Sequence, residues 1–230
     1  MKKFFKILGL IILLIIITLS IIGWAMSEDL PNGKTGPKAD ELAQKILNSV
    51  NHEAFKKTKI ISWNFAGFHA YEWHKSEDFV ILNFDENKVH LNLKDYSKSK
   101  VLTPENISEE KRNTLIEESI KNFNNDSFWL VAPHKIMDKN VERKLVKHNN
   151  NDALLVTYKS GGTTPGDSYL WILDKNYRPK AFKMWVSIIP IGGLKAEWKN
   201  WKTTETEIIL STQKSIFGFP IEINNLSTKH

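Results

Sequence analysis

The sequence predicts a mainly β protein: one large curved antiparallel sheet, or half-open β-barrel, with two covering helices and an N-terminal membrane helix before it. Three observations favour this fold class. Short runs rich in Val, Ile, Tyr, Phe and Trp recur between turn signals, aromatic residues make up 11% of the chain, and two amphipathic stretches interrupt the strands. The clearest segment is 154–185, where three apolar runs are separated by turns at 161–166 and 174–179, as in a double hairpin.

Length and charge limit the classes of function. The chain has 230 residues, enough for one large domain and a leader. It contains no cysteine, which excludes disulfides, thiol catalysis and a lipid-modified N-terminal Cys. Its net charge is +6, but Lys2, Lys3 and Lys6 precede the apolar leader and leave +3 for the rest. Since the remaining lysines are scattered among acidic residues, no nucleic-acid partner is expected.

Residues 1–26 form the leader. A positive segment, 2–6, precedes a run that is apolar from Ile7 to Ile22 except for Gly9, Thr18 and Ser20. An uncleaved transmembrane anchor is favoured because the apolar length suits a bilayer and Trp24 stands where an interface anchor would lie. The alternative is a signal sequence cleaved near Ser27. In both cases the lysines indicate that the domain lies on the extracytoplasmic, periplasmic side of a membrane.

The chain after the leader divides into three parts. Residues 27–38 hold two Pro and two Gly and predict a flexible linker. Residues 39–224 form the half-barrel domain, and 225–230 are expected to be a frayed tail. The domain begins with a helix over 39–50, whose apolar positions recur at helical spacing: Leu42, Ile46, Leu47 and Val50.

The first strands are predicted at 59–67, at 79–84 and at 88–93, and the last two form a hairpin. Three histidines in this region, His69, His74 and His90, invite a metal interpretation. His69 and His74 differ by five positions, so a continuous strand would point them to opposite faces, and His90 falls on the polar face. No metal site and no cofactor are therefore expected.

A middle helix is predicted from the capping residue Ser108 to about Asn122, with an apolar stripe along one face. It either packs on the core or acts as a movable cover over an apolar cavity. A turn at 124–126 and a short strand at 128–131 are expected to follow. Asp126 and His134 do not amount to an acid–base pair, since nothing in the sequence brings them together and no nucleophile motif follows.

The C-terminal half supplies the remaining strands. The polar run 141–148 is typical of an edge strand, and 207–216 and 220–223 give the last strands, for about ten to twelve in all. The pairs Gly161-Gly162 and Gly192-Gly193 are turn glycines, since neither has the spacing of a phosphate loop.

A sheet of this size must curl or close, and seven apolar side chains on inward-facing positions are the candidate lining of a hydrophobic cavity. These candidate ligand-binding residues are Trp63, Phe65, Trp73, Tyr169, Trp171, Met184 and Trp198. No catalytic residue is assigned.

The order of leading helix, meander, middle helix and second meander over 39–224 resembles the periplasmic lipoprotein-carrier (LolA/LolB-like) superfamily. A nearer resemblance, carried by FNNDSFWLVAP at 123–133 and SGGTTPGDSYLWILD at 160–174, is to uncharacterised bacterial envelope proteins. The first resemblance implies a half-open barrel whose mouth is covered by helices and which binds acyl chains or other hydrophobic ligands.

Two functions are therefore carried forward. The first is a non-enzymatic, membrane-tethered envelope protein that binds a lipid, an acyl group or another hydrophobic ligand. The alternative is an extracytoplasmic protein-interaction or scaffold module, whose interior is filled by its own aromatic side chains. An enzyme ranks third. The sequence names no protein partner.

Overall fold

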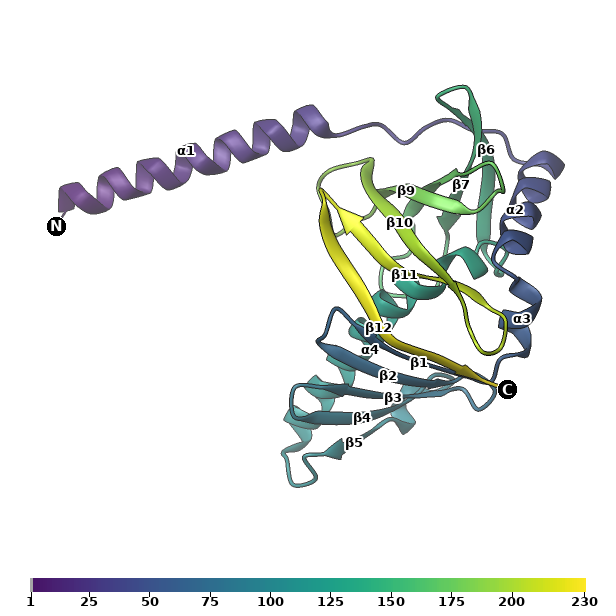
Figure 1. Ribbon diagram of the computed structural model, residues 1–230. Coiled ribbons are helices and arrows are strands. Elements are labelled where there is room, and N and C mark those ends of the chain that lie inside the picture. The colour runs from purple at the N-terminus through teal and green to yellow at the C-terminus, as the bar shows by residue number, and fades with distance from the viewer. Residues whose placement is uncertain (1) are drawn as a thin grey trace.

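The computed structural model describes residues 2–230, except for the side chains of Lys2, Lys3, Ile16, Leu19, Ser20 and Ile22. The domain is one antiparallel sheet of twelve strands in the order β5-β4-β3-β2-β1-β12-β11-β10-β9-β8-β7-β6. The sheet is strongly curved (Figure 1). It is not closed, because within the described chain β5 and β6 are its two edges. The prediction of a mainly β protein with a large curved antiparallel sheet is confirmed.

The strands alternate with short turns along the chain. Their bounds are β1 Ile60–Phe65, β2 His69–His74, β3 Phe79–Phe84, β4 Asn87–Asn92, β5 Lys100–Thr103, β6 Val141–His148, β7 Asn151–Tyr158, β8 Ser168–Leu173, β9 Pro179–Trp185, β10 Leu194–Thr203, β11 Ile209–Ile216 and β12 Phe219–Lys229. Strand β6 is an edge strand, as its polar sequence predicts.

Two helices cover the sheet where the sequence places them. Helix α2 (Pro37–Ser49) packs on β6 and β7 and buries Leu42, Ile46 and Leu47. Helix α4 (Glu109–Val131) crosses the concave side and contacts β4, β5 and β11 (Figure 1). A further short helix, α3 (His52–Lys57), follows α2, and two 3-10 turns, η1 (Tyr96–Lys98) and η2 (Ala132–His134), complete the elements after residue 27.

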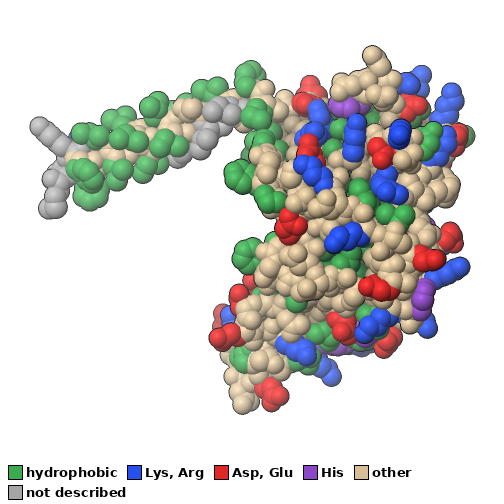
Figure 2. Space-filling model, viewed as in Figure 1, with side chains coloured by type: hydrophobic (Ala, Val, Ile, Leu, Met, Phe, Trp, Pro, Cys, Tyr) green, Lys and Arg blue, Asp and Glu red, His purple; other side chains and the backbone are tan. Residues whose placement is uncertain are grey.

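Helix α1 (Lys2–Met26) holds the predicted leader. It projects away from the domain, and Figure 2 shows apolar side chains along it. Within the part of the chain that the structure describes, no helix combines the length and the hydropathy needed to cross a bilayer. The positive side chains of Lys2 and Lys3 lie outside the described residues. Whether the leader is an uncleaved anchor or a signal stays a prediction.

Helix α4 is longer than expected. The turn predicted at 124–126 and the short strand predicted at 128–131 are wrong, because the helix continues through both. Its buried positions keep a spacing of three or four residues as far as Val131, and Asp126 finds hydrogen-bond partners outside the helix. The helix ends at Val131, two residues before Pro133, which has no backbone N–H to continue the α-helical hydrogen bonds. The buried positions are Leu115, Ser119, Phe123, Asp126, Ser127, Leu130 and Val131.

The last residues also differ from expectation. Most of the segment 225–230 is not a tail, since β12 runs to Lys229 and pairs with β1, from Phe65 opposite Ile223 to Ile60 opposite Lys229. Thr228 is buried, and its hydroxyl accepts a hydrogen bond from the backbone N–H of Thr206 at 3.1 Å. Pairing with β1 thus satisfies the backbone at this end of the chain.

Residues 27–38 touch the domain at two points. Lys34 exchanges two backbone hydrogen bonds with Leu145 of β6, with N···O distances of 3.0 and 2.8 Å. Glu28 lies against Gly192, donating its backbone N–H to the carbonyl of Gly192 at 2.9 Å. The first contact covers part of the β6 edge, where unpaired backbone groups would otherwise be exposed.

Because neighbouring strands are antiparallel, successive turns lie alternately on two rims of the sheet. The rim nearest the end of α1, called here the α1 rim, carries turns 66–68, 85–86, 159–167, 186–193 and 217–218. The opposite rim carries turns 75–78, 93–99, 149–150, 174–178 and 204–208.

Candidate functional site

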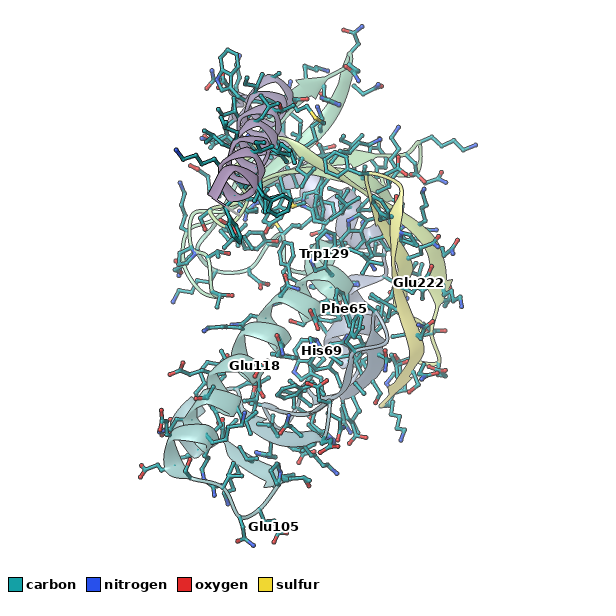
Figure 3. The ribbon with its side chains drawn as sticks, turned by 90° about the vertical axis from the view of Figure 1, so that its left-hand side faces the viewer. Phe65, His69, Glu105, Glu118, Trp129 and Glu222 are labelled. Carbon is teal, nitrogen blue, oxygen red and sulfur yellow. The ribbon has the colours of Figure 1, made fainter. Side chains whose placement is uncertain are left out.

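A cleft of about 760 Å³ lies between the C-terminal half of α4 and the strands β8 and β9. Two turns of the α1 rim, 159–167 and 186–193, contribute to its border. Figure 3 views the molecule from this rim, with α4 lying across the sheet and Trp129 near its C-terminal end. The cleft is larger than a second hollow, of about 530 Å³, that is described below.

Aromatic side chains form part of the wall of the cleft. Phe128 of α4 lies with its ring centre 4.6 Å from that of Tyr169 and 5.5 Å from that of Tyr158. The ring centre of Trp129 lies 5.3 Å from that of Phe182, which forms the layer beneath. The apolar lining is completed by residues of both sheet halves, of α4 and of the 186–193 turn: Trp73, Phe123, Val141, Met184, Val186, Ile188 and Ile189.

About half of the lining residues are polar or charged, and most of these belong to α4 and to turn 159–167. Lys121, Lys135 and Lys139 contribute the cations. Both acids have partners: Asp138 lies 3.4 Å from Lys135 Nζ, and Asp167 accepts a hydrogen bond from a backbone N–H at 2.9 Å.

The hydroxyl of Tyr158 is buried in this wall and has no hydrogen-bond partner among the described residues. Burial, more than the neighbouring Tyr169 and Asp138, raises the pKa of Tyr158 well above its ordinary value. The hydroxyl therefore keeps its proton and remains a hydrogen-bond donor in the wall of the cleft.

Three of the seven predicted lining residues, Trp73, Tyr169 and Met184, lie in the cleft. Phe65 is half-buried and packs on the core cluster of the first five strands. The other three, Trp63, Trp171 and Trp198, are 2%, 0% and 2% exposed and belong to the solid core.

Trp171 in particular is fully buried and does not line the cleft, because its ring packs against those of Phe182 and Trp198, with centres 5.2 and 5.3 Å away. The alternation of side chains along a strand shows which of them face inward, but it does not show which part of the concave face a helix covers.

The sequence interpretation missed the cleft residues of α4, above all Phe128 and Trp129. The signal that could have found them is the helical spacing of Phe123, Ser127 and Leu130, which continues the stripe of Leu115 and Ser119. Assigning 128–131 to a strand hid it.

A buried carboxylate fixes this part of α4 on the sheet. Asp126 is 2% exposed and accepts a hydrogen bond from the hydroxyl of Tyr71 at 2.7 Å. His69 Nδ1 lies 2.6 Å from the same oxygen, and Asn125 donates to the other at 2.8 Å. Burial, and then the carboxylate, raises the pKa of Tyr71, so its hydroxyl remains a donor. These contacts join α4 to β2 (Figure 3).

His134 lies in a different cluster. Its ring stacks on Phe55 at 4.4 Å, and its Nδ1 is 3.4 Å from Nδ1 of His52. Burial lowers the pKa of His134 to about 3. Within the described residues Asp126 and His134 share no hydrogen bond, so the structure does not assemble them into an acid–base pair.

The histidines of the first strands also have structural partners. His74 pairs with Glu72 at 2.5 Å and stacks on Phe79, and His90 stacks on the same ring. Among the side chains that the structure describes, no three His, Cys, Asp or Glu residues gather closely enough to hold a metal ion.

A second hollow, of about 530 Å³, lies beneath the chain that follows α1. Its wall is charged, with Lys183, Lys195, Lys199, Glu28 and Glu197. Glu28 forms an ion pair with Lys183 at 2.5 Å, and Glu197 with Lys199 at 2.7 Å. This hollow is therefore part of the linker's attachment to the domain, and the aromatic cleft is the candidate ligand site.

Comparison with known proteins gives two distant structural matches. No protein-family model and no curated protein matches the chain. Among solved structures, it is similar to a DUF1329 family protein from Desulfovibrio piger, with 11% identity, a TM-score of 0.41, and coverage of 83% of this chain and 93% of that one.

It is also similar to a domain from Vibrio parahaemolyticus that is provisionally named an outer membrane lipoprotein-sorting protein. That match has 10% identity, a TM-score of 0.39, and coverage of 81% of this chain and 93% of that one. At these identities and scores neither structure assigns a function to this chain. Its own fold and site define a curved, unclosed antiparallel sheet with a cleft, lined in part by aromatic side chains, beside its covering helix.

Proposed function

We propose that the protein is a non-enzymatic envelope protein that binds a lipid or acyl ligand in the cleft beside α4. The observation that carries this proposal is the cleft itself, about 760 Å³ in volume with six aromatic side chains in its lining. Sites for small molecules typically measure about 300–1,000 Å³ and combine an apolar lining with a few placed polar groups.

The polar groups of the cleft favour a ligand with one apolar and one polar end. An apolar chain would lie against Phe128, Trp129 and Met184. A carbonyl or acidic head group could accept the hydrogen bond of Tyr158 or lie near the lysines at the edge, such as Lys121. A ligand that is charged along its whole length would leave its charges unpaired against the aromatic wall.

The proposal includes a location outside the cytoplasm, with α1 holding the domain at a membrane. Its support is the positive segment 2–6 before an apolar run, together with the exposed apolar side chains of α1, among them Phe4, Leu10 and Trp24. The alternative, a signal sequence cleaved near Ser27, has a direct test. The intact mass of the protein recovered from membranes shows whether residues 1–26 are still present.

A scaffold without a ligand is the second candidate, and one observation favours it. Trp63, Trp171 and Trp198 fill much of the concave face with solid core. The two candidates differ in whether the cleft is occupied. Native mass spectrometry of the full chain purified from membranes should show bound lipid if the cleft is a carrier site.

Uptake of a fluorescent long-chain fatty acid tests the same point with a defined ligand. Trp129→Ala, which removes a wall of the cleft, should weaken uptake about tenfold, or about 1.4 kcal/mol. Trp201→Ala is the matched control, because Trp201 is also half-buried but stacks on Trp198 at 5.9 Å outside the cleft. If the purified protein carries no lipid and takes up no fatty acid, the carrier hypothesis is refuted and the scaffold hypothesis stands.

A further inference from the structure

Four exposed apolar side chains gather on one rim of the sheet. In residues 27–230, all of which the structure describes, the most exposed large apolar side chains are Phe219 at 76%, Phe68 at 75%, Ile188 at 72% and Phe217 at 62%. The next, Leu30, is only 46% exposed. All four stand in or beside turns of the α1 rim, and Figure 2 shows hydrophobic side chains along the edge of the domain on that side.

The turns that carry them differ from most turns of the opposite rim. Turns 66–68, 186–193 and 217–218 contain no charged residue. On the opposite rim, turns 75–78, 93–99 and 174–178 each contain three and turn 204–208 contains two, while the two-residue turn 149–150 contains none. The other two turns of the α1 rim are charged: turn 159–167 contains Lys159 and Asp167, and turn 85–86 is acidic but joins β3 to β4, which lie far in the strand order from β9 and β10, the strands joined by turn 186–193. Turns usually carry polar side chains that water can solvate, so three uncharged aromatic or aliphatic turns on one rim indicate an apolar neighbour.

The end of α1 is fastened to one of these turns. Ser27, the first residue after α1, accepts a hydrogen bond through its hydroxyl from the N–H of Gly192 at 3.0 Å. The carbonyl of Glu28 accepts a hydrogen bond from the indole of Trp185 at 2.7 Å, and its carboxylate pairs with Lys183 at 2.5 Å. The apolar helix therefore joins the domain at the apolar rim, with no free linker between them, and runs outward from it (Figure 1).

We propose that the α1 rim docks on the surface of a lipid bilayer, with Phe68, Ile188, Phe217 and Phe219 inserted at its interface. This inference rests on the proposed membrane role of α1. If α1 enters a bilayer, Ser27 lies at the bilayer surface, and its contact with Gly192 brings turn 186–193 to the same level. Aromatic side chains are favoured at that depth, and insertion removes exposed apolar area from water at about 25 cal/mol per Å².

Docking in this orientation gives the cleft its route to ligand. Turns 159–167 and 186–193 border the cleft and belong to the same rim. The cleft would thus open next to the lipid surface, and an acyl chain would cross little water between the bilayer and the site. A protein partner on this rim is the competing occupant, but it would have to cover three separate turns while leaving room for α1, which leaves from the same place.

The absence of cysteine allows a clean test on the full chain. Single substitutions Phe68→Cys and Phe219→Cys on the α1 rim, which lie outside the cleft lining, and Ser76→Cys and Lys175→Cys on the opposite rim, would carry an environment-sensitive fluorophore. All four positions are exposed, so labelling should leave the core intact. The labelled proteins are reconstituted in phosphatidylcholine vesicles and quenched from the lipid phase with spin-labelled lipid and from the aqueous phase with iodide.

We expect the labels at positions 68 and 219 to be quenched several-fold more by the lipid-borne quencher than the control labels, with the reverse order for iodide. Equal quenching on both rims in vesicles that carry the protein would overturn the docking. Labels at 68 and 219 shielded from both quenchers would show coverage by protein and overturn it as well. Failure of the chain to float with the vesicles would refute the anchor, and the docking with it.

The same samples separate this inference from ligand binding. Uptake of the fluorescent fatty acid by detergent-solubilised protein does not depend on the rim. If the protein takes up no fatty acid but its α1 rim is selectively quenched from the lipid phase, the carrier function is refuted and the docking surface stands. If it takes up fatty acid but the two rims are quenched equally, the docking surface is refuted and the carrier function stands.

Discussion

The bond between Tyr71 and Asp126 gives the most direct test of how α4 is held. Asp126 lies in the segment of α4 that lines the cleft, and its carboxylate is 2% exposed. Tyr71 of β2 donates to it at 2.7 Å and is itself 3% exposed. We expect Tyr71→Phe and Asp126→Asn to destabilise the protein, and their effects to be coupled.

The magnitude follows from the partners that each change leaves behind. Tyr71→Phe removes one donor from an ionised acceptor, which typically costs about 1.5–3 kcal/mol. The carboxylate keeps His69 at 2.6 Å and Asn125 at 2.8 Å, so the loss should lie in the lower half of that range. Asp126→Asn replaces the charged acceptor of both Tyr71 and His69, so it should cost more. The coupling energy should be about 1–2 kcal/mol.

Urea unfolding of the full chain in detergent, followed by tryptophan fluorescence, measures all four proteins of the double-mutant cycle. Tyr96→Phe is the control: Tyr96 is partly exposed, and losing its hydroxyl should change stability by less than about 0.5 kcal/mol. An additive cycle, with a coupling energy below about 0.5 kcal/mol, would refute the view that this bond fastens the helix to the sheet.

Three further predictions concern backbone and buried groups. Gly161 and Gly162 have φ of 85° and 64°, so replacing either with Val should cost about 1–2 kcal/mol or more in thermal melts. Because burial lowers the pKa of His134 to about 3, only the unfolded chain binds that proton between about pH 3 and pH 6.5, and stability falls as the pH falls. His134→Leu should flatten this fall, and an unchanged slope in urea melts would contradict it. Burial also lowers the pKa of Lys214 well below its usual value. The unfolded chain holds this proton up to about pH 10.4, so wild-type stability should rise with pH towards that value. Lys214→Met should stabilise most at pH 7, and a gain that did not shrink towards pH 10 would argue against the shift.

The sheet could be predicted because its signals are local. Alternation in residues such as Val89 and Leu91, and the turn residues between strands, determine each hairpin without reference to distant residues. The polar run of β6 likewise indicates an edge strand. The final strand was missed because 225–230 has little apolar pattern and is held by pairing with β1, which is 160 or more residues away in the sequence.

The cleft was only partly predictable for a related reason. Tyr169, Trp171 and Met184 all have inward-facing positions, but whether such a side chain meets a ligand or a helix depends on where α4 lies. That position depends in turn on Asp126, whose partners on β2 are more than 50 residues earlier in the chain. Asn124, Asn125 and Asp126 in succession indicate a turn by local preference, and tertiary hydrogen bonds overcome that preference here.

The arrangement of bonds on α4 also determines how the cleft can change. On one side the helix is fixed to β2 by the buried hydrogen bond of Asp126. On the other side, facing β8 and β9, Phe128 and Trp129 make ring contacts that have no fixed partner atom. Ring contacts tolerate small displacements, whereas a buried carboxylate that loses its hydrogen-bond donors strongly destabilises the folded protein. An entering acyl chain should therefore separate α4 from β8 and β9 and leave the contact with β2 intact. This widens the cleft towards turns 159–167 and 186–193, the side on which the exposed apolar turns and α1 lie.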